Sequence, residues 1–290
     1  LSAVNFEPTT KITNKPKTKR KNLPFPKTST ISVKTFFNEE IVAHVSMAQP
    51  TSPGLSNCCE SALKKLNIKN IIASYNPSNP KRVLLCAHWD SRPFADQDSK
   101  DQDKAIMGAN DGGSGDGVLL EMARIFSIEN PKIGVDLVLF DAEDWGDNSG
   151  KVEDSYCLGS QYWAKNPHIQ SYKADFGILL DMVGASNARF PQEAYSMQYA
   201  SSIVTKVWQA AADAGYSSYF VYEDAGNITD DHFFVNTLAG IPTIDIIHLQ
   251  KTGFASHWHT QQDNLNRISK STLKAVGQTL LQYLHQLPKS

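Results

Sequence analysis

The feature that most constrains the fold is an alternation of short apolar runs with stretches of helical spacing. Four near-continuous apolar runs cover residues 83–87, 135–140, 176–180 and 243–247. Strands buried on both faces have this pattern, and they are typical of mostly parallel sheets with helices on each side. We therefore predict an α/β three-layer sandwich whose mostly parallel (mixed) central sheet is flanked by helices.

Helical spacing fills the rest of the chain beyond its N-terminal part. The predicted helices cover residues 33–48, 57–66, 117–126, 156–164 and 196–214, and a C-terminal helix begins near residue 269. Residues 1–30 differ, because lysines and prolines alternate there and such a segment can bury little surface. We expect an extended basic arm over residues 1–30, docked on the domain rather than binding an acidic partner, and a single domain over residues 31–290.

Composition excludes several classes of function. The formal net charge is −2 over 290 residues, so we expect no nucleic-acid partner. No apolar stretch approaches the roughly 18 residues of a membrane span, so we expect no transmembrane helix. The four cysteines include the adjacent pair Cys58 and Cys59, which does not resemble a disulfide framework, and we expect buried free thiols.

Acidic residues and histidines follow the ends of the apolar runs. The first run is followed by His88 and Asp90, the second by the segment Asp-Ala-Glu-Asp at residues 141–144, and the third by Asp181. A Gly-Ala-Asn-Asp segment containing Asp111 precedes a predicted helix. A late loop carries His-Trp-His at residues 257–259. In open α/β sheets, ligands bind beyond the carboxyl ends of the strands.

Each of these residues has a simpler explanation when taken alone. Asp111 could cap the following helix, Asp90 and Asp181 could accept hydrogen bonds from loop amides, and the two late histidines could lie on the surface. However, carboxylates gathered at one sheet edge repel one another and are costly to bury. A divalent cation removes that cost, and a mixture of imidazole and carboxylate ligands suits zinc. The adjacent acids Glu143 and Asp144 then allow one to bind metal and the other to act as a general base.

The order of these motifs resembles that of the M28-type zinc aminopeptidases, and a narrower resemblance is to the glutaminyl cyclases of that clan. Residues 86–91, Cys-Ala-His-Trp-Asp-Ser, resemble their Cys-His-Tyr-Asp-Ser, and residues 180–185, Leu-Asp-Met-Val-Gly-Ala, resemble their Leu-Asp-Leu-Ile-Gly-Ala. Residues 229–232, Thr-Asp-Asp-His, resemble their Gln-Asp-Asp-His. Residues 258–260, Trp-His-Thr, with Asp-Asn at 263–264, resemble their Trp-His-Thr-x-x-Asp-Asn.

The resemblance implies a role for each matching position. It makes Asp111, Asp144 and His259 the ligands of a single zinc ion per chain. It makes Glu143 the general base and acid, with Asp181 and Asp230 as its hydrogen-bonding partners. Trp258 and Phe254 are implied to line the substrate pocket, and Trp145 or Trp89 to replace a tryptophan that has no aligned equivalent. Three departures favour a bacterial branch of the family: Asp144 replaces a glutamate, Thr229 replaces a glutamine, and Cys86 has no partner for the disulfide of the animal enzymes.

The implied activity is zinc-dependent conversion of N-terminal glutamine of peptides or proteins to pyroglutamate, with release of ammonia. The alternative is a two-zinc aminopeptidase, in which His88, Asp111 and Asp181 bind one ion and Asp111, Asp144 and His259 bind the other; all five ligands are present. A non-catalytic binding module on this scaffold is less favoured, because Glu143 and the metal residues are all retained. From the family and the start at Leu1 we expect an exported monomer, either periplasmic or secreted, or lipid-anchored through a removed N-terminus.

Overall fold

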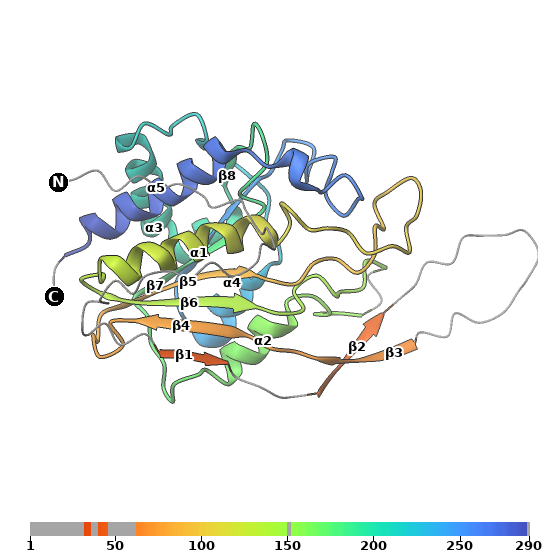
Figure 1. The fold of residues 1–290 in the computed structure, drawn as a ribbon, viewed down its shortest axis with the longest axis horizontal. Coiled ribbons are helices and arrows are strands. Elements are labelled where there is room, and N and C mark those ends of the chain that lie inside the picture. Colours follow the sequence, from red (N-terminus) through yellow and green to blue (C-terminus); the bar gives the residue numbers. More distant parts are fainter. Residues whose placement is uncertain (1–31, 36–39, 46–61, 150–151, 289–290) are drawn as a thin grey trace, which may run out of the picture.

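The central sheet of the computed structural model has six strands in the order β1-β4-β6-β5-β7-β10. The structure describes residues 32–35, 40–45, 62–149 and 152–288. The strands are β1 (Ser32–Thr35), β4 (Ile71–Tyr75), β5 (Arg82–His88), β6 (Gly134–Phe140), β7 (Phe176–Asp181) and β10 (Thr243–Ile247). The four strands β6, β5, β7 and β10 are parallel, whereas β4 is antiparallel to both β6 and β1 (Figure 1). This confirms the predicted mixed sheet.

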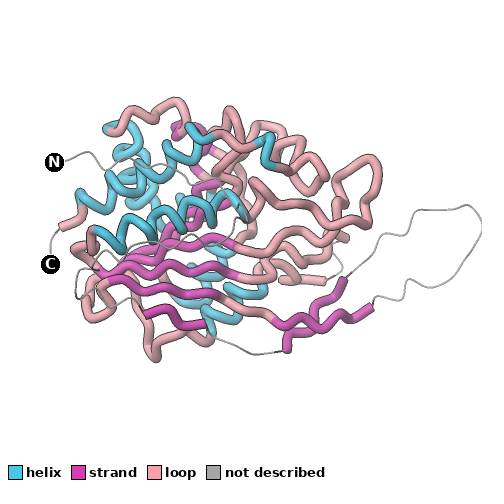
Figure 2. Tube along the Cα trace, viewed as in Figure 1, coloured by secondary structure: helices cyan, strands magenta, loops and turns pink. Residues whose placement is uncertain are grey.

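Helices cover both faces of the sheet. The long helices α1 (Gly113–Ile128), α3 (Ala194–Asp213) and α5 (Lys270–Gln286) pack with one another and with the sheet on one face. The shorter α2 (Leu158–Lys165) and α4 (Asp231–Phe234), with the π-helical turn Val235–Ala239, lie on the other face (Figure 2). Each face of the sheet has its own hydrophobic core. Along β5, Val83 and Leu85 pack into the core under α1, α3 and α5, whereas Leu84 and Cys86 pack into the core under α2, because successive side chains of a strand point to opposite faces. The three-layer arrangement is confirmed.

Two small sheets lie outside the central one. Strands β2 (Glu40–Val45) and β3 (Ala62–Asn67) form an antiparallel pair, and β8 (Phe190–Gln192) pairs in parallel with β9 (Phe220–Asp224). A 3-10 turn over Leu265–Arg267 precedes α5. In the described part of the chain, no helix is long and apolar enough to cross a membrane.

The two helices predicted nearest the N-terminus are wrong where the structure describes them. The helix expected over residues 33–48 is replaced by β1 and β2, and the end of the helix expected over 57–66 lies in β3. Residues 40–45, Glu-Ile-Val-Ala-His-Val, are rich in β-branched side chains, which favour a strand once a partner strand is available. The proposed arm over residues 1–30 lies outside the described residues. The structure adds the five-residue strand β4, for which no apolar run is predicted.

The chain order of the strands creates a crevice at the carboxyl edge of the sheet. After β5 the chain passes through α1 to β6 on one side, and later returns to β7 on the other side of β5. Adjacent connections that leave in opposite directions open a space beyond the strand ends, which is where open α/β sheets bind ligands. His88 is the last residue of β5 and Asp181 is the last residue of β7, so both lie at the edge of this crevice.

Candidate active site

The imidazole of His88 is the centre of one group of ligand-type side chains. Its Nε2 lies 3.2 Å from Asp111 Oδ1 and 3.2 Å from Asp181 Oδ1, and all three residues are buried. Its Nδ1 lies 3.5 Å from Asp90 Oδ1. Asp90 mainly serves the backbone, because its two carboxylate oxygens accept the amides of Glu143 at 3.0 Å and Asp144 at 3.1 Å. The simpler explanation for Asp90, a carboxylate that holds a loop, is thus correct, and that loop carries the two adjacent acids.

The loop before α1 presents Asp111 to the same space. The residue directly before α1 is Gly112, and within the described part of the chain no side chain caps this helix. The alternative in which Asp111 is a helix cap is therefore wrong. Gly112 has a φ of 83°, and a Cβ there would lie 2.6 Å from the carbonyl oxygen of Asp90, so the close approach needs glycine. Asp263 accepts the amides of Asn110 at 2.9 Å and Asp111 at 3.0 Å. The Asp111 carboxylate is therefore turned away from the helix and towards the histidines.

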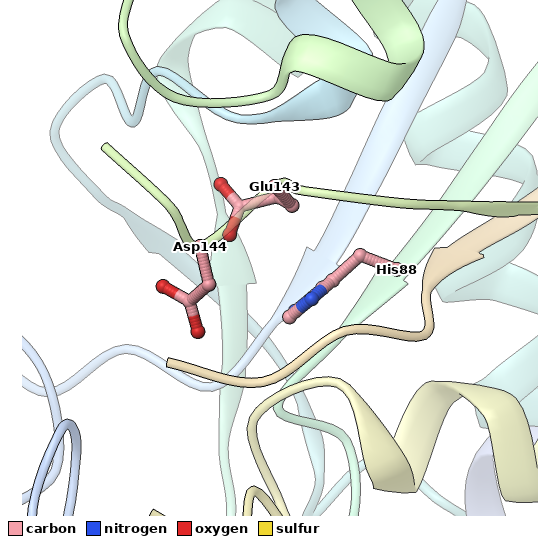
Figure 3. A group of neighbouring side chains, drawn as sticks. All are labelled: His88, Glu143 and Asp144. Atoms are coloured by element: carbon pink, nitrogen blue, oxygen red, sulfur yellow. The ribbon is translucent and has the colours of Figure 1, made fainter. Parts of the chain in front are cut away.

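The loop after β6 separates its two adjacent acids. Ala142 has a left-handed φ of 55°, which bends the backbone just before them. Glu143 and Asp144 leave the loop in different directions, with the imidazole of His88 beside both (Figure 3). One carboxylate oxygen of each acid and a ring nitrogen of His88 nevertheless lie within 4.8 Å of one another, so proximity alone does not decide which of the two acids binds metal and which carries a proton.

His259 approaches from the late loop and completes a second group. Its Nε2 lies 2.9 Å from Asp144 Oδ1 and 3.5 Å from Asp111 Oδ2. The residue has a φ of 52°, and the indole of Trp258 stacks on its imidazole with ring centroids 3.7 Å apart. Phe254 stacks in turn on Trp258 at 4.3 Å. Of the two aromatic residues expected at the substrate pocket, Trp258 therefore lies directly on His259, and Phe254 lies behind it.

The donor atoms of the second group fit a metal ion. One ligand atom from each of Asp111, Asp144 and His259 lies within 4.8 Å of the others, and all three residues are buried. Oδ2 of Asp111 and Oδ2 of Asp144 have no hydrogen-bond partner within the described residues. Buried carboxylate oxygens without donors are costly unless a cation satisfies them. Two carboxylates and one imidazole form a ligand set that zinc accepts.

His88, Asp111 and Asp181 form another group with the same spacing. The two groups share Asp111, so the geometry brings together all five residues of the two-zinc alternative. Ligand type and proximity therefore do not separate a one-zinc site from a two-zinc site.

Charge interactions in this cluster displace several pKa values. Burial, reinforced by the nearby Asp144 carboxylate, raises the pKa of Asp111 to about 7. Burial alone would also raise the pKa of Asp144, but the charge and the hydrogen bond of His259 hold it below its usual value. Burial would lower the pKa of His259, yet the charge of Asp144 raises it to about 9. Without a metal ion, the group thus retains protons that a cation would displace.

Glu143 lies in surroundings that favour its protonated form. Burial first, and then the charge of Asp144, raise its pKa well above the usual value for a glutamate. Asp230 contributes in the same direction, and one oxygen of each carboxylate lies within 4.8 Å of the other. Asp181, the other expected neighbour of Glu143, instead makes its close contact with His88 at 3.2 Å.

The structure also reveals neighbours of Glu143 that the sequence did not suggest. The Cys157 thiol donates a hydrogen bond to Glu143 Oε1 at 3.2 Å. Asp231 and Asp245 are fully buried near Asp230, and burial raises the pKa of both well above the usual value. The adjacent acids at residues 230–231 are a sequence signal for Asp231. Asp245 lies within an apolar strand and Cys157 directly precedes α2, so no sequence pattern marks either of them.

The other two tryptophans considered for the pocket lie in different surroundings. Trp89 is 41% exposed, and its indole Nε1 donates to the carbonyl oxygen of Lys69 at 2.9 Å. Trp145 follows the two adjacent acids and is half-buried. The two cysteines in the described residues, Cys86 and Cys157, are both buried free thiols, as expected. Cys58 and Cys59 lie outside those residues.

Comparison with known proteins decides the family. The model of peptidase family M28 matches residues 70–284. The chain belongs to peptidase family M28. This M28 chain is 45% identical to a glutaminyl cyclase from Porphyromonas gingivalis of known structure, with a TM-score of 0.79, over 88% of this chain and 84% of that one. It is 46% identical to a structure from Parabacteroides distasonis described as a Zn-dependent exopeptidase, with a TM-score of 0.78, over 88% and 85% of the two chains.

A curated relative extends the similarity beyond bacteria. Bovine glutaminyl-peptide cyclotransferase is 26% identical over 255 residues, which are 76% of this chain and 67% of that protein. The predicted resemblance of the M28 chain to glutaminyl cyclases, and to bacterial ones above all, is confirmed. The family, the exopeptidase neighbour and the geometry of the ligands together support zinc as the metal.

Proposed function

We propose that this protein is a zinc-dependent glutaminyl-peptide cyclotransferase, which converts the N-terminal glutamine of peptides or proteins to pyroglutamate and releases ammonia. One observation carries the proposal: Glu143, with its raised pKa, lies beside the group of Asp111, Asp144 and His259 in a chain 45% identical to a glutaminyl cyclase. A proton carrier next to a metal group is what an intramolecular acyl transfer needs.

We assign Asp111, Asp144 and His259 as the ligands of one zinc ion per chain. When bound, zinc supplies a Lewis acid that polarises the γ-carbonyl of the substrate glutamine and stabilises negative charge on its oxygen. Asp111 Oδ2 and Asp144 Oδ2, which are buried without a hydrogen-bond donor in the described residues, would be satisfied by such an ion.

Glu143 moves the proton. As a carboxylate, it accepts a proton from the α-amine of the substrate while the amine nitrogen forms its bond to the γ-carbonyl carbon. The same carboxyl group then donates that proton to the amide nitrogen, which leaves as ammonia when the carbon–nitrogen bond breaks. The raised pKa of Glu143 suits both steps, because the group exchanges its proton closer to neutral pH than an ordinary glutamate does.

Neighbouring residues hold the reacting groups in place. Asp230 lies beside Glu143 and keeps its proton available, and Asp181 holds the imidazole of His88 at the end of the strand. The stacked rings of Phe254 and Trp258 form an aromatic wall next to His259, which suits the aliphatic part of a bent glutamine side chain. Trp89 and Trp145 are proposed as further parts of that wall.

The second candidate function is a two-zinc aminopeptidase. The specific observation in its favour is the group of His88, Asp111 and Asp181, whose ligand atoms lie as close together as those of the first group. A neighbour described as a Zn-dependent exopeptidase also points in this direction. The relatives described as glutaminyl cyclases favour the cyclase.

The deciding experiment offers the protein two substrates and counts the metal. A peptide that begins with glutamine is incubated with the zinc-loaded protein, and mass spectrometry is used to detect loss of one ammonia. A leucyl-amide substrate is tested in parallel for release of leucine. We expect pyroglutamate, no leucine release and one zinc per chain; leucine release without pyroglutamate, together with two zinc ions per chain, would establish the peptidase.

We also propose that the protein acts outside the cytoplasm, in the periplasm or as a secreted or lipid-anchored protein, and that it is a monomer. Both proposals follow from the family resemblance alone. Fractionation of the producing cells and sedimentation of the purified protein test them.

A further inference from the structure

Arg92 is a buried cation that has no part in the proposed reaction. It is 2% exposed, and its guanidinium group makes hydrogen bonds on two sides. On one side, Nη1 donates to the carbonyl oxygens of Asp144 at 2.7 Å and Gly146 at 2.8 Å. On the other side, Nη2 donates to Asp96 Oδ2 at 2.8 Å and Nε donates to Asp96 Oδ1 at 3.3 Å. A buried arginine with this many partners holds two backbone segments in a fixed relation.

Asp96 links Arg92 to His259, which is another proposed metal ligand. Its Oδ1 lies 3.4 Å from Nδ1 of His259, on the opposite side of the ring from the Nε2 that faces Asp111 and Asp144. That distance is long for a hydrogen bond but close enough for attraction between the carboxylate and an N–H group. A carboxylate at the far nitrogen of an imidazole keeps the proton there, so that the near nitrogen presents its lone pair to a metal.

The surroundings of Arg92 and Asp96 fix both side chains. The guanidinium carbon lies 5.4 Å from the ring centroid of Tyr156 and 5.9 Å from that of Phe94. The Tyr156 hydroxyl donates to the side-chain oxygen of Asn148, and the Asn148 amide donates to Asp96. The contacts close a ring of residues around the guanidinium group, so neither Arg92 nor Asp96 can turn without breaking several of them.

We propose that Arg92 and Asp96 are positioning residues that act on both sides of one metal group. They orient His259 through its Nδ1 and fix the loop of Asp144 through its carbonyl oxygen, and in this way they set the affinity of Asp111, Asp144 and His259 for zinc. The inference rests on the metal group of the proposed function and is independent of whether the reaction is cyclisation or hydrolysis.

The test compares zinc affinity in the full chain of three variants and the wild type. Asp96→Asn removes the charge that faces His259 but keeps the size of the side chain, and Arg92→Lys keeps the charge but loses the forked hydrogen bonds. The matched control is Asp101→Asn, which removes one negative charge from the same loop. The Asp101 side chain is 57% exposed, and its ion pair within the described residues is with Lys104. Each protein is stripped of metal, and its zinc dissociation constant is measured by competition with a chelator.

We expect the dissociation constant to rise about 10–100-fold in Asp96→Asn and Arg92→Lys, the effect typical of partners behind a metal ligand. Asp101→Asn should bind zinc like the wild type. Circular dichroism of the apo proteins shows whether each variant is folded. If Arg92→Lys fails to fold, Asp96→Asn still decides the test, because Asp96 is partly exposed and Arg92 keeps its hydrogen bonds to the carbonyl oxygens of Asp144 and Gly146 in that variant.

Two results would overturn the proposal: wild-type affinity in Asp96→Asn, or equal weakening in Asp96→Asn and Asp101→Asn. The proposed function fails separately, when the wild type binds zinc tightly but forms no pyroglutamate. A wild type that binds no zinc at all overturns both.

Discussion

Two of the groups of ligand-type residues found in the described part of the chain share Asp111 but are built differently. In the group of His88, Asp111 and Asp181, two members lie on the last residues of central strands. In the group of Asp111, Asp144 and His259, every member lies on a loop. Strand ends position side chains through the ladder of the sheet, whereas loops need partners of their own to hold them.

The loop-built group has those partners. Asp263 fixes the backbone of Asp111, Arg92 fixes that of Asp144, and Trp258 covers the ring of His259. On the strand-built side, Asp90 lies 3.5 Å from His88 but already accepts two backbone amides. Ligand chemistry alone therefore does not select a metal site; the residues that hold the ligands in place distinguish the two groups.

Replacing one histidine of each group with alanine tests which group binds the metal. His259→Ala should lose zinc and activity, with kcat/KM falling on the order of 10³-fold or more because several kcal/mol of charge stabilisation depend on the ion. His88→Ala should keep one zinc per chain. Elemental analysis of both variants measures the ratio of zinc to protein. A wild type with two zinc ions that falls to one in His88→Ala would instead show that the strand-built group is occupied.

Glu143 lies beside both groups, and its replacement separates metal binding from proton transfer. Glu143→Gln keeps the shape of the side chain but cannot accept a proton, so we expect kcat to fall about 10²–10⁴-fold. The zinc content should remain that of the wild type. Steady-state kinetics together with metal analysis checks this. Unchanged activity would remove Glu143 from the mechanism and leave another group as the proton carrier.

The pH dependence of stability tests whether zinc displaces the protons held at this edge. Burial raises the pKa of Asp111 and of Asp116 to about 7, and the charge of Asp144 raises that of His259 to about 9 against burial. Each of these pKa values is higher in the folded than in the unfolded protein, so the folded protein holds more protons. The free energy of unfolding is therefore higher at low pH and falls as pH rises through the folded-state pKa. The apo protein should therefore become less stable between pH 5 and pH 9.

Zinc should oppose this trend, because it binds the deprotonated forms of Asp111 and His259. We expect zinc to raise Tm by more at pH 8 than at pH 6, by a difference of several degrees, since about 1 kcal/mol moves the Tm of a domain of this size by roughly 2–4 °C. Calorimetry of apo and loaded protein at both pH values is the measurement. In His259→Ala, zinc should no longer raise Tm, whereas in His88→Ala it should still do so. The reverse pattern would contradict His259 as a zinc ligand.

Within the described residues, an aromatic ring stacks on His259, where Trp258 lies, but not on His88. Trp258→Ala removes the ring that stacks at 3.7 Å, and an aromatic pair is worth about 0.5–1.5 kcal/mol. We expect zinc affinity to weaken roughly 2–10-fold and KM to rise. Trp89→Ala is the matched control for zinc affinity alone, because this indole is 41% exposed and donates to the backbone of Lys69 rather than stacking on a proposed zinc ligand. Equal effects in the two variants would mean that the stack has no special role.

The strongly patterned parts of the fold could be predicted from the sequence. Apolar runs at residues 83–87, 135–140, 176–180 and 243–247 each lie within a central strand, because continuous burial leaves few other solutions. The N-terminal strands β1, β2 and β3 could not, since their formation depends on partner strands rather than on local preference.

The sequence by itself determined which residue types lie at the carboxyl edge of the sheet. A strand must end where its apolar run ends, so the acids and histidines that follow the runs gather there, and the family motifs attach a chemistry to them. The tertiary structure alone decided which of them face one another. It turned Asp181 towards His88, placed the Cys157 thiol on Glu143, and put Arg92 behind both Asp144 and Asp96. Such contacts join segments far apart in the chain, and their geometry depends on how the loops pack, which no local pattern encodes.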